Sequence, residues 1–219
     1  MKRGTQDFAL KEKGWRGKNL DRGRENADNG SVMKGVVRMR RFLCGFLCLC
    51  LLWTGLCFGA AAEDAEEMIS YLNIVGGESD YLMHGTNGFR VPVEGVRRRI
   101  QASHESDNSV ILIALDGGKI IARAELDGYA GARLRHNAKL SISVRKDYWN
   151  RKIGTALMTE LMERAKNMNL RNIELEVIAG NTAAIALYHK MGFTELGTYR
   201  DYWFTNNAYS DAIIMQKCL

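Results

Sequence analysis

The chain has 219 residues, of which 46% are hydrophobic, and a formal net charge of +6. Residues 1–41 hold twelve Lys and Arg against five Asp and Glu, so the remaining residues carry a net charge of −1. The basic balance therefore gives no argument that the remainder binds nucleic acid. Four of the five cysteines lie in one apolar run, which excludes a disulfide framework.

The first 62 residues contain two segments of opposite character. Residues 1–41 are polar and basic with almost no apolar periodicity, so we expect a disordered extension. Residues 42–62 form an uncharged apolar run that is long enough to span a bilayer as a helix. Counted from Met39, the run also has the basic start and small-residue end of a secretory signal. Both interpretations stay open.

Residues 63–219 are long enough for one domain with its own core. Their upstream part predicts two helices, a loop with few periodic signals, and two strands that pair around Asp116-Gly117-Gly118. These elements cover residues 64–73 and 93–103 (helices), 76–90 (loop), and 109–115 and 119–126 (strands). The run Arg97-Arg98-Arg99 is interpreted as a solvated helix face and not as a nucleic-acid patch.

The next segment has the pattern of a strand that leads into a helix. Leu140, Ile142 and Val144 alternate with serines, which is typical of a half-buried strand. Apolar residues then recur at helical spacing from Ile153 onward. The first N–H groups of a helix lack partners and carry partial positive charge, so the junction predicts a phosphate site. Its candidate residues are Arg151, Lys152, Gly154, Thr155 and Ala156.

A second strand and helix follow. Residues 173–177 alternate between apolar side chains and glutamates, and Asn181 is a good N-cap for the helix behind them. Tyr188 lies on the apolar face of that helix. Gly192 stands where a helix end needs left-handed backbone, and Phe193 returns the chain to an apolar strand. The aromatic-rich tail, residues 197–215, predicts a closing hairpin whose aromatic side chains suit an acceptor wall or sheet packing; we favour packing.

Two of these runs resemble the cofactor-binding signatures of the GNAT acetyltransferases. They are R-K-I-G-T-A at residues 151–156 and N-T-A-A-I-A-L-Y-H-K-M-G-F at residues 181–193. The segment with Leu175-Glu176-Val177 is similar to the ribosomal-protein alanine acetyltransferase branch, which is nearest in motif. The resemblance implies an α/β (α+β) fold in which a mixed, mostly antiparallel sheet is flanked by helices and splayed near acetyl-CoA. One departure is Lys152, where glycine is common in the family.

The resemblance also implies residues for binding the co-substrate. The pyrophosphate of coenzyme A is expected on the loop and helix start already named, that is, on Arg151, Lys152, Gly154, Thr155 and Ala156. Further cofactor-binding positions are Ile142, Ser143, Val144 and Asn181. We predict no metal site, because His84, His104 and His189 have no Cys, Asp or Glu partners at metal-ligand spacing.

The implied reaction is direct attack of a primary amine on acetyl-CoA in a ternary complex. Tyr188 is the expected acid for the departing thiolate, and Glu176 is the expected base, although a solvated Glu176 stays open. A water relay that includes His136 is an alternative base. Glu78, Asp80 and Tyr81 are candidate substrate contacts. The acceptor classes left open are a protein N-terminus, a polyamine and a small-molecule amine, and both a monomer and a homodimer stay open.

The family offers a third interpretation of the apolar run, because its sheet begins with a short strand before the first helix. Residues 56–61 would supply that strand, and the residues upstream would be an appendage from a start codon assigned too early. Acidic residues after the run would place an inserted domain outside the cytoplasm, away from acetyl-CoA. We therefore expect a cytoplasmic catalytic domain, with membrane association through residues 42–62 left open. A membrane-tethered acyl-CoA-binding module without turnover is the alternative function.

Overall fold

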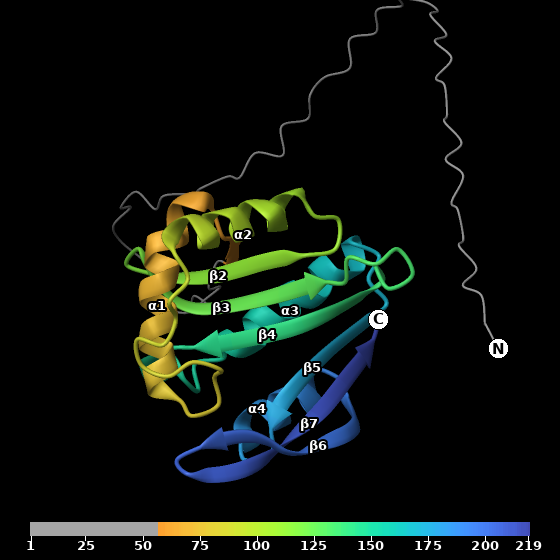
Figure 1. The fold of residues 1–219 in the computed structure, drawn as a ribbon. Coiled ribbons are helices and arrows are strands. Elements are labelled where there is room, and N and C mark those ends of the chain that lie inside the picture. The colour runs from red at the N-terminus through yellow and green to blue at the C-terminus, as the bar shows by residue number, and fades with distance from the viewer. Residues whose placement is uncertain (1–56) are drawn as a thin grey trace, which may run out of the picture. The chain divides into compact units, whose positions relative to one another are not determined.

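A seven-stranded sheet with the order β1-β2-β3-β4-β5-β7-β6 organises residues 57–219, the part of the chain that the computed structural model describes (Figure 1). Neighbouring strands are antiparallel except β4 and β5, which are parallel. The predicted α/β (α+β) class with a mixed, mostly antiparallel sheet is therefore confirmed. The strands are β1 (Cys57–Gly59), β2 (Val110–Asp116), β3 (Lys119–Gly128), β4 (Asn137–Val144), β5 (Asn172–Ile178), β6 (Thr194–Thr205) and β7 (Ala208–Cys218).

Strand β1 is the edge of the sheet and lies at the end of the apolar run. It pairs with β2, and Phe58 lies opposite Ile113. This pairing agrees with the third interpretation of the apolar run, in which residues 56–61 supply the first strand of the sheet. Residues 1–41 and 42–56, with the predictions made for them, lie outside the described residues. Within residues 57–219, no helix is both long and apolar enough to cross a membrane.

The helices cover both faces of the sheet (Figure 1). Helices α1 (Ala65–Glu78) and α2 (Val93–Glu105) lie on one face, and α3 (Ile153–Asn167) and α4 (Thr182–Lys190) lie on the other. The first face buries Met68, Tyr71 and Ile100 against Ile111 and Ile113 of β2, together with smaller neighbours. We call this the α1–α2 face. Leu157, Met158 and Leu161 of α3 are fully buried in the larger core on the opposite face.

Helix α1 is longer than predicted. The predicted loop starts at Gly76, but Gly76 and Gly77 are helical, and the helix ends at Glu78. The glycines permit close packing and do not end the helix. A Cβ on Gly76 would lie only 2.6 Å from the carbonyl oxygen of His84. The following loop can therefore fold back closely against the last turn of α1.

The other glycine predictions are confirmed. Gly117 and Gly118, in the turn between β2 and β3, have φ values of 55° and 85°. Gly192, directly after α4, has φ of 85°. Each stands at a position that a residue with a Cβ adopts only with strain.

The closing hairpin forms as predicted, but its aromatic side chains are not packed as we favoured. Phe193 is buried, yet β6 beyond it is mostly exposed and is not an apolar strand. The relative exposures of Tyr199, Tyr202, Phe204 and Tyr209 are 45%, 50%, 59% and 68%. The prediction of sheet packing was wrong for these four residues. Three of them lie on β6, the edge strand of the sheet, and Tyr209 lies at the start of β7, paired with Phe204 of that edge strand.

Candidate active site

Strands β4 and β5 diverge after a short parallel contact (Figure 1). Their pairing covers Asn137 to Lys139 on β4 and Asn172 to Glu174 on β5, and then stops. Both strands continue, β4 to Val144 beside β3 and β5 to Ile178 beside β7. We call the space between their carboxyl-terminal halves the V. It is the splay that the family resemblance predicts.

The backbone of β4 turns hydrogen-bonding groups toward the V. In an antiparallel pair, alternate residues bond to the neighbouring strand, and those between face the other way. Arg145 N donates to Ile121 O on the β3 side, whereas His136 O accepts from Asn172 N on the β5 side. Odd-numbered residues of β4 therefore bond to β3. Ile142 and Val144 direct their backbone groups into the V.

The predicted residue Ser143 acts differently from its two neighbours. Its backbone belongs to the β3 side, and its side chain lies on the α1–α2 face, where the Tyr71 hydroxyl donates to Ser143 O at 2.8 Å and lies 2.9 Å from Ser143 Oγ. Tyr71 is otherwise buried, and burial is the main reason that its pKa lies above the ordinary value. Local sequence patterns do not predict this contact, because the two residues are 72 positions apart. Through this contact, helix α1 holds β4 at Ser143, where β4 forms one edge of the V.

Helix α3 begins at the open end of β4 with free donors. Ala156 N donates to Lys152 O, but the N–H groups of Ile153, Gly154 and Thr155 have no partner among the described residues. No side chain in the described part of the chain caps this end, and its first turn has no acidic residue. Such an end attracts an anion. The predicted loop residues Arg151, Lys152 and Ala156 are exposed beside it.

The loop before α3 has a left-handed residue, a closely packed glycine and an arginine held over an aromatic ring. Lys152 has φ of 61° and ψ of 11°, a left-handed conformation, which explains why glycine suits this position. A Cβ on Gly154 would lie 3.3 Å from Leu187 Cδ2, so this glycine permits close packing of α3 on α4. Arg151 lies over the ring of Tyr148, 5.0 Å from its centroid, which orients its charge near the helix start.

Helix α4 is capped, in contrast to α3. Asn181 Oδ1 accepts from Ala184 N at 3.3 Å, which confirms the predicted N-cap. The cap occupies the side-chain oxygen, so only the amide NH2 group of Asn181 has no partner among the described residues.

Tyr188 of α4 is 6% exposed and packs on Phe193, with ring centroids 5.9 Å apart. Burial raises the pKa of Tyr188 to about 12. Its hydroxyl makes no hydrogen bond to a described residue, yet no described side-chain oxygen or nitrogen is both sealed from solvent and unpaired. The hydroxyl therefore retains contact with open space and can donate to a ligand.

Glu176 lies on the opposite face of β5 from Leu175 and Val177, as predicted. Lys139 Nζ donates to Glu176 Oε1 at 2.8 Å, and the Tyr202 hydroxyl donates to Oε2 at 3.3 Å. The pKa of Lys139 lies above its ordinary value because, although burial lowers it, Glu176 outweighs that effect. The Glu176 side chain is 28% exposed. It is thus neither sealed nor simply solvated, but held by Lys139 of β4 and Tyr202 of β6 on the α1–α2 face of the sheet.

The candidate substrate contacts Glu78, Asp80 and Tyr81 bind the end of α1 and the loop after it to segments on both sides of the V. Glu78 accepts from Arg145 Nε and from Lys146 N, both directly beyond β4. The Tyr81 hydroxyl donates to Gly180 O, directly beyond β5. The backbone oxygen of Asp80 accepts from Trp203 of the closing hairpin, and its carboxylate accepts from Asn206. The loop therefore joins the two diverging strands.

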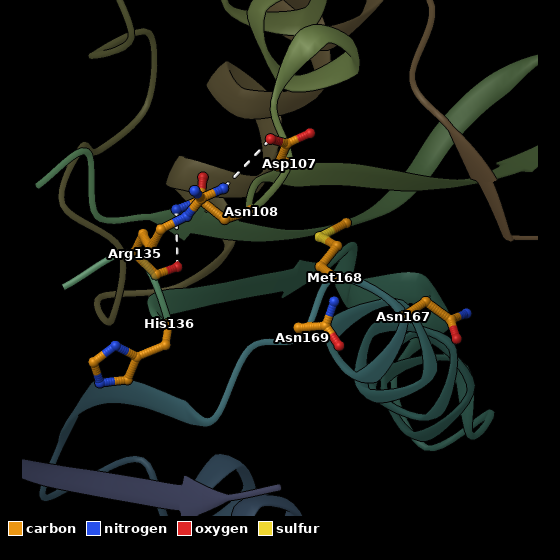
Figure 2. A pocket seen from close by; sticks show the side chains of 7 residues that line it. All are labelled: Asp107, Asn108, Arg135, His136, Asn167, Met168 and Asn169. Carbon is orange, nitrogen blue, oxygen red and sulfur yellow. Dashed lines mark hydrogen bonds and ion pairs between the residues drawn. The ribbon is translucent and has the colours of Figure 1, made fainter. Parts of the chain in front are cut away.

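His136 does not belong to this site. It stands just before β4, at the end opposite the V, and lines a separate cavity of about 460 Å³ (Figure 2). Arg135, Asp107 and three asparagines share that cavity, and Arg135 lies 3.4 Å from Asp107. Residues 57–219 contain no group of His, Cys, Asp and Glu side chains that could hold a metal ion.

Known proteins resemble this chain in sequence. Residues 81–193 match the sequence profile of the acetyltransferase (GNAT) family. The L-amino acid N-acetyltransferase AaaT of Escherichia coli K12 is 34% identical over 107 residues, which cover 48% of this chain and 66% of that protein. The ribosomal protein bS18-alanine N-acetyltransferase of the same strain is 40% identical over 75 residues, which cover 34% of this chain and 51% of that protein.

The fold has a counterpart among solved structures. A GNAT-family acetyltransferase from Streptococcus pneumoniae superposes with a TM-score of 0.73 at 30% identity, over 75% of this chain and 99% of that chain. The curated matches, by contrast, span only about two thirds and about half of the two enzymes from E. coli.

The left-handed Lys152 predicts a measurable gain in stability on substitution. Lys152→Gly should raise the free energy of unfolding by about 1 kcal/mol, because glycine removes the Cβ strain of this conformation. Lys152→Ala is the matched control, since it removes the same charge but keeps the Cβ. Urea unfolding of both variants measures the difference. Equal stability of the glycine and alanine variants would contradict the strain.

Proposed function

Because the chain belongs to the GNAT family of acetyltransferases, we propose that it transfers the acetyl group of acetyl-CoA to a primary amine. The observation that carries this proposal is the adjacency of the V and the uncapped start of α3. The V offers unpaired backbone groups to an extended ligand, and the start of α3 attracts a phosphate. Acetyl-CoA combines an amide-containing arm with a pyrophosphate, so both features suit one co-substrate.

The donors at α3 fit the pyrophosphate. The N–H groups of Ile153, Gly154 and Thr155 are available, and Arg151 and Lys152 add positive charge beside them. The arm of the co-substrate would lie along β4 and bond to Ile142 and Val144. Either backbone N–H, directed into the V, is a suitable donor for the thioester oxygen as negative charge develops on it. Ser143 contributes by holding β4 through Tyr71, and not by touching the co-substrate.

Tyr188 is the proposed general acid. The acceptor nitrogen forms a bond to the thioester carbonyl carbon, the carbon–sulfur bond breaks, and the sulfur leaves with the electron pair. The Tyr188 hydroxyl, with its pKa raised by burial to about 12, holds its proton across the working pH range and can give it to the sulfur. Its lack of another described partner supports this assignment.

Glu176 is the proposed general base. It lies on β5 beside the V, on the face where an acceptor can approach, and the amine must lose a proton before or during its attack. Lys139 and Tyr202 fix the orientation of its carboxylate. The products are an N-acetyl amide and coenzyme A, formed in one ternary complex with no acetylated enzyme.

The names of the two relatives from E. coli support one acceptor class, the α-amine. One named relative acts on L-amino acids and the other on an alanine of a ribosomal protein. We therefore propose the α-amine of an amino acid, peptide or protein N-terminus as the acceptor here. Since acetyl-CoA is a cytoplasmic metabolite, the catalytic part of the chain would act in the cytoplasm.

Substitution of the acid and the base tests the chemistry. Tyr188→Phe and Glu176→Gln should each lower kcat by about 10²–10⁴-fold, because each removes one proton-transfer group. Coenzyme A release by the full chain, with acetyl-CoA and a panel of amino acids and N-terminal peptides, measures this. The wild-type rate should not fall on the alkaline side through Tyr188 below about pH 11, since its raised pKa keeps it protonated there.

The matched controls for this experiment are conservative changes nearby. Tyr209→Phe alters an exposed tyrosine of β7, and Glu174→Gln alters the neighbouring carboxylate of β5, which accepts from Tyr129. Both should retain wild-type turnover within a few-fold. If Tyr188→Phe turns over as fast as Tyr209→Phe, Tyr188 is not the acid. Coenzyme A binding without turnover of any amine would instead favour the binding module.

A charge at the start of α3 tests the phosphate site. Thr155→Glu should lower kcat/KM for acetyl-CoA by at least about 10-fold through repulsion of the pyrophosphate. The same change should not lower the free energy of unfolding, because a carboxylate in the first turn favours the helix. Thr155→Gln is the isosteric control. S-acetylpantetheine, which lacks phosphate, should react equally with both variants; an equal loss with that thioester would contradict the assignment.

A further inference from the structure

A mostly buried arginine on β3 is not used by the proposed chemistry. Arg123 lies on the α1–α2 face, directly opposite Ser143 of β4. Its side chain is only 16% exposed. It therefore lies one strand away from the edge of the V, on the face where Glu176 meets the acceptor.

Arg123 belongs to a small network of charged side chains. Glu125, which is 6% exposed, accepts from Arg123 Nη2 and, at 2.9 Å, from Arg99 Nε. Arg99 also donates to Asp127 at 3.1 Å. Glu125 is thus paired twice, and it keeps one arginine partner if the other is removed.

The network leaves part of the Arg123 guanidinium unpaired. Arg123 Nε and Nη1 have no hydrogen-bond partner among the described residues, whereas Nη2 donates to Glu125. No described side-chain nitrogen is both sealed from solvent and unpaired, so Nε and Nη1 each keep some contact with solvent. A guanidinium that is desolvated on one side and open on the other binds a carboxylate strongly.

The distance between Arg123 and the V limits which carboxylates of an acceptor can reach the guanidinium. Neighbouring strands lie about 5 Å apart, so Arg123 stands roughly 5–10 Å from an amine that reacts beside β4. An extended peptide advances by about 3.3 Å per residue, and a glutamate side chain adds several ångströms. A carboxylate about one residue beyond the reacting amine would reach Arg123, whereas the carboxylate of a single amino acid lies too close to its amine.

We propose that Arg123 recognises a carboxylate carried by the second residue of a peptide acceptor, so that the chain prefers N-termini of the form Xaa-Glu or Xaa-Asp. This specificity rests on the proposed function and adds a substrate class to it. Arg123 orients the acceptor, and takes no part in the proton transfers.

The test uses two acceptors that differ only in charge, Ala-Glu-amide and Ala-Gln-amide, with acetyl-CoA and the full chain. The wild type should favour the acidic peptide by about 10–100-fold in kcat/KM, the usual range for a charge-assisted pair. Arg123→Gln should remove this preference by slowing only the acidic peptide. Arg99→Gln breaks the same bond network but keeps the open guanidinium, so it should retain the preference.

Three results would overturn the proposal: no preference in the wild type, equal losses for both peptides in Arg123→Gln, or loss of the preference in Arg99→Gln. Thermal unfolding of both variants separates a folding defect from a recognition defect. Calorimetric titration of Ala-Glu-amide in the presence of coenzyme A tests the contact without turnover, and Arg123→Gln should weaken binding by a similar factor. Turnover of Ala-Gln-amide that depends on Tyr188 keeps the proposed function standing even where the specificity fails.

Discussion

The separation of β4 from β5 is the constraint on which the site depends. Each strand is held by seven residue pairs on its outer side, β4 by β3 and β5 by β7, whereas only three pairs join the two to each other. The outer partners therefore determine where each strand goes. Past Lys139, the hydrogen-bonding groups of two strands face a space that no strand of residues 57–219 fills.

The rest of the molecule maintains this opening. Tyr71 holds β4 from the α1–α2 face, Glu78 holds the turn directly beyond it, and Tyr81 ties the same loop to the turn after β5. On the opposite face, the packing of Gly154 on Leu187 brings the start of α3 close to α4. The unpaired donors of α3 and the hydroxyl of Tyr188 are thereby held on the same side of the sheet.

Local patterns in the sequence predicted most of the fold and the local conformation around the residues proposed to bind the co-substrate. The strand alternation from Leu140 to Val144, the N-cap at Asn181 and the left-handed Gly192 each follow from a few neighbouring residues, and each is present. Features that depend on distant contacts could not be predicted in this way. The contact of Tyr71 with Ser143, the ion pair of Glu176 with Lys139 and the bond from Arg99 to Glu125 all require the pairing of strands or helices far apart in the chain. The exposed aromatic residues of β6 were misjudged because composition does not reveal which strand is at the edge.

Amide hydrogen exchange along β4 tests the central claim most directly. With ¹⁵N-labelled full chain, saturating coenzyme A should slow exchange at Ile142 and Val144, whose N–H groups face the V, and at Gly154 and Thr155 at the start of α3. Ser141 and Ser143, whose N–H groups already bond to β3, should change much less. Equal protection of odd and even residues, or none at α3, would contradict the assignment of the V as the co-substrate site.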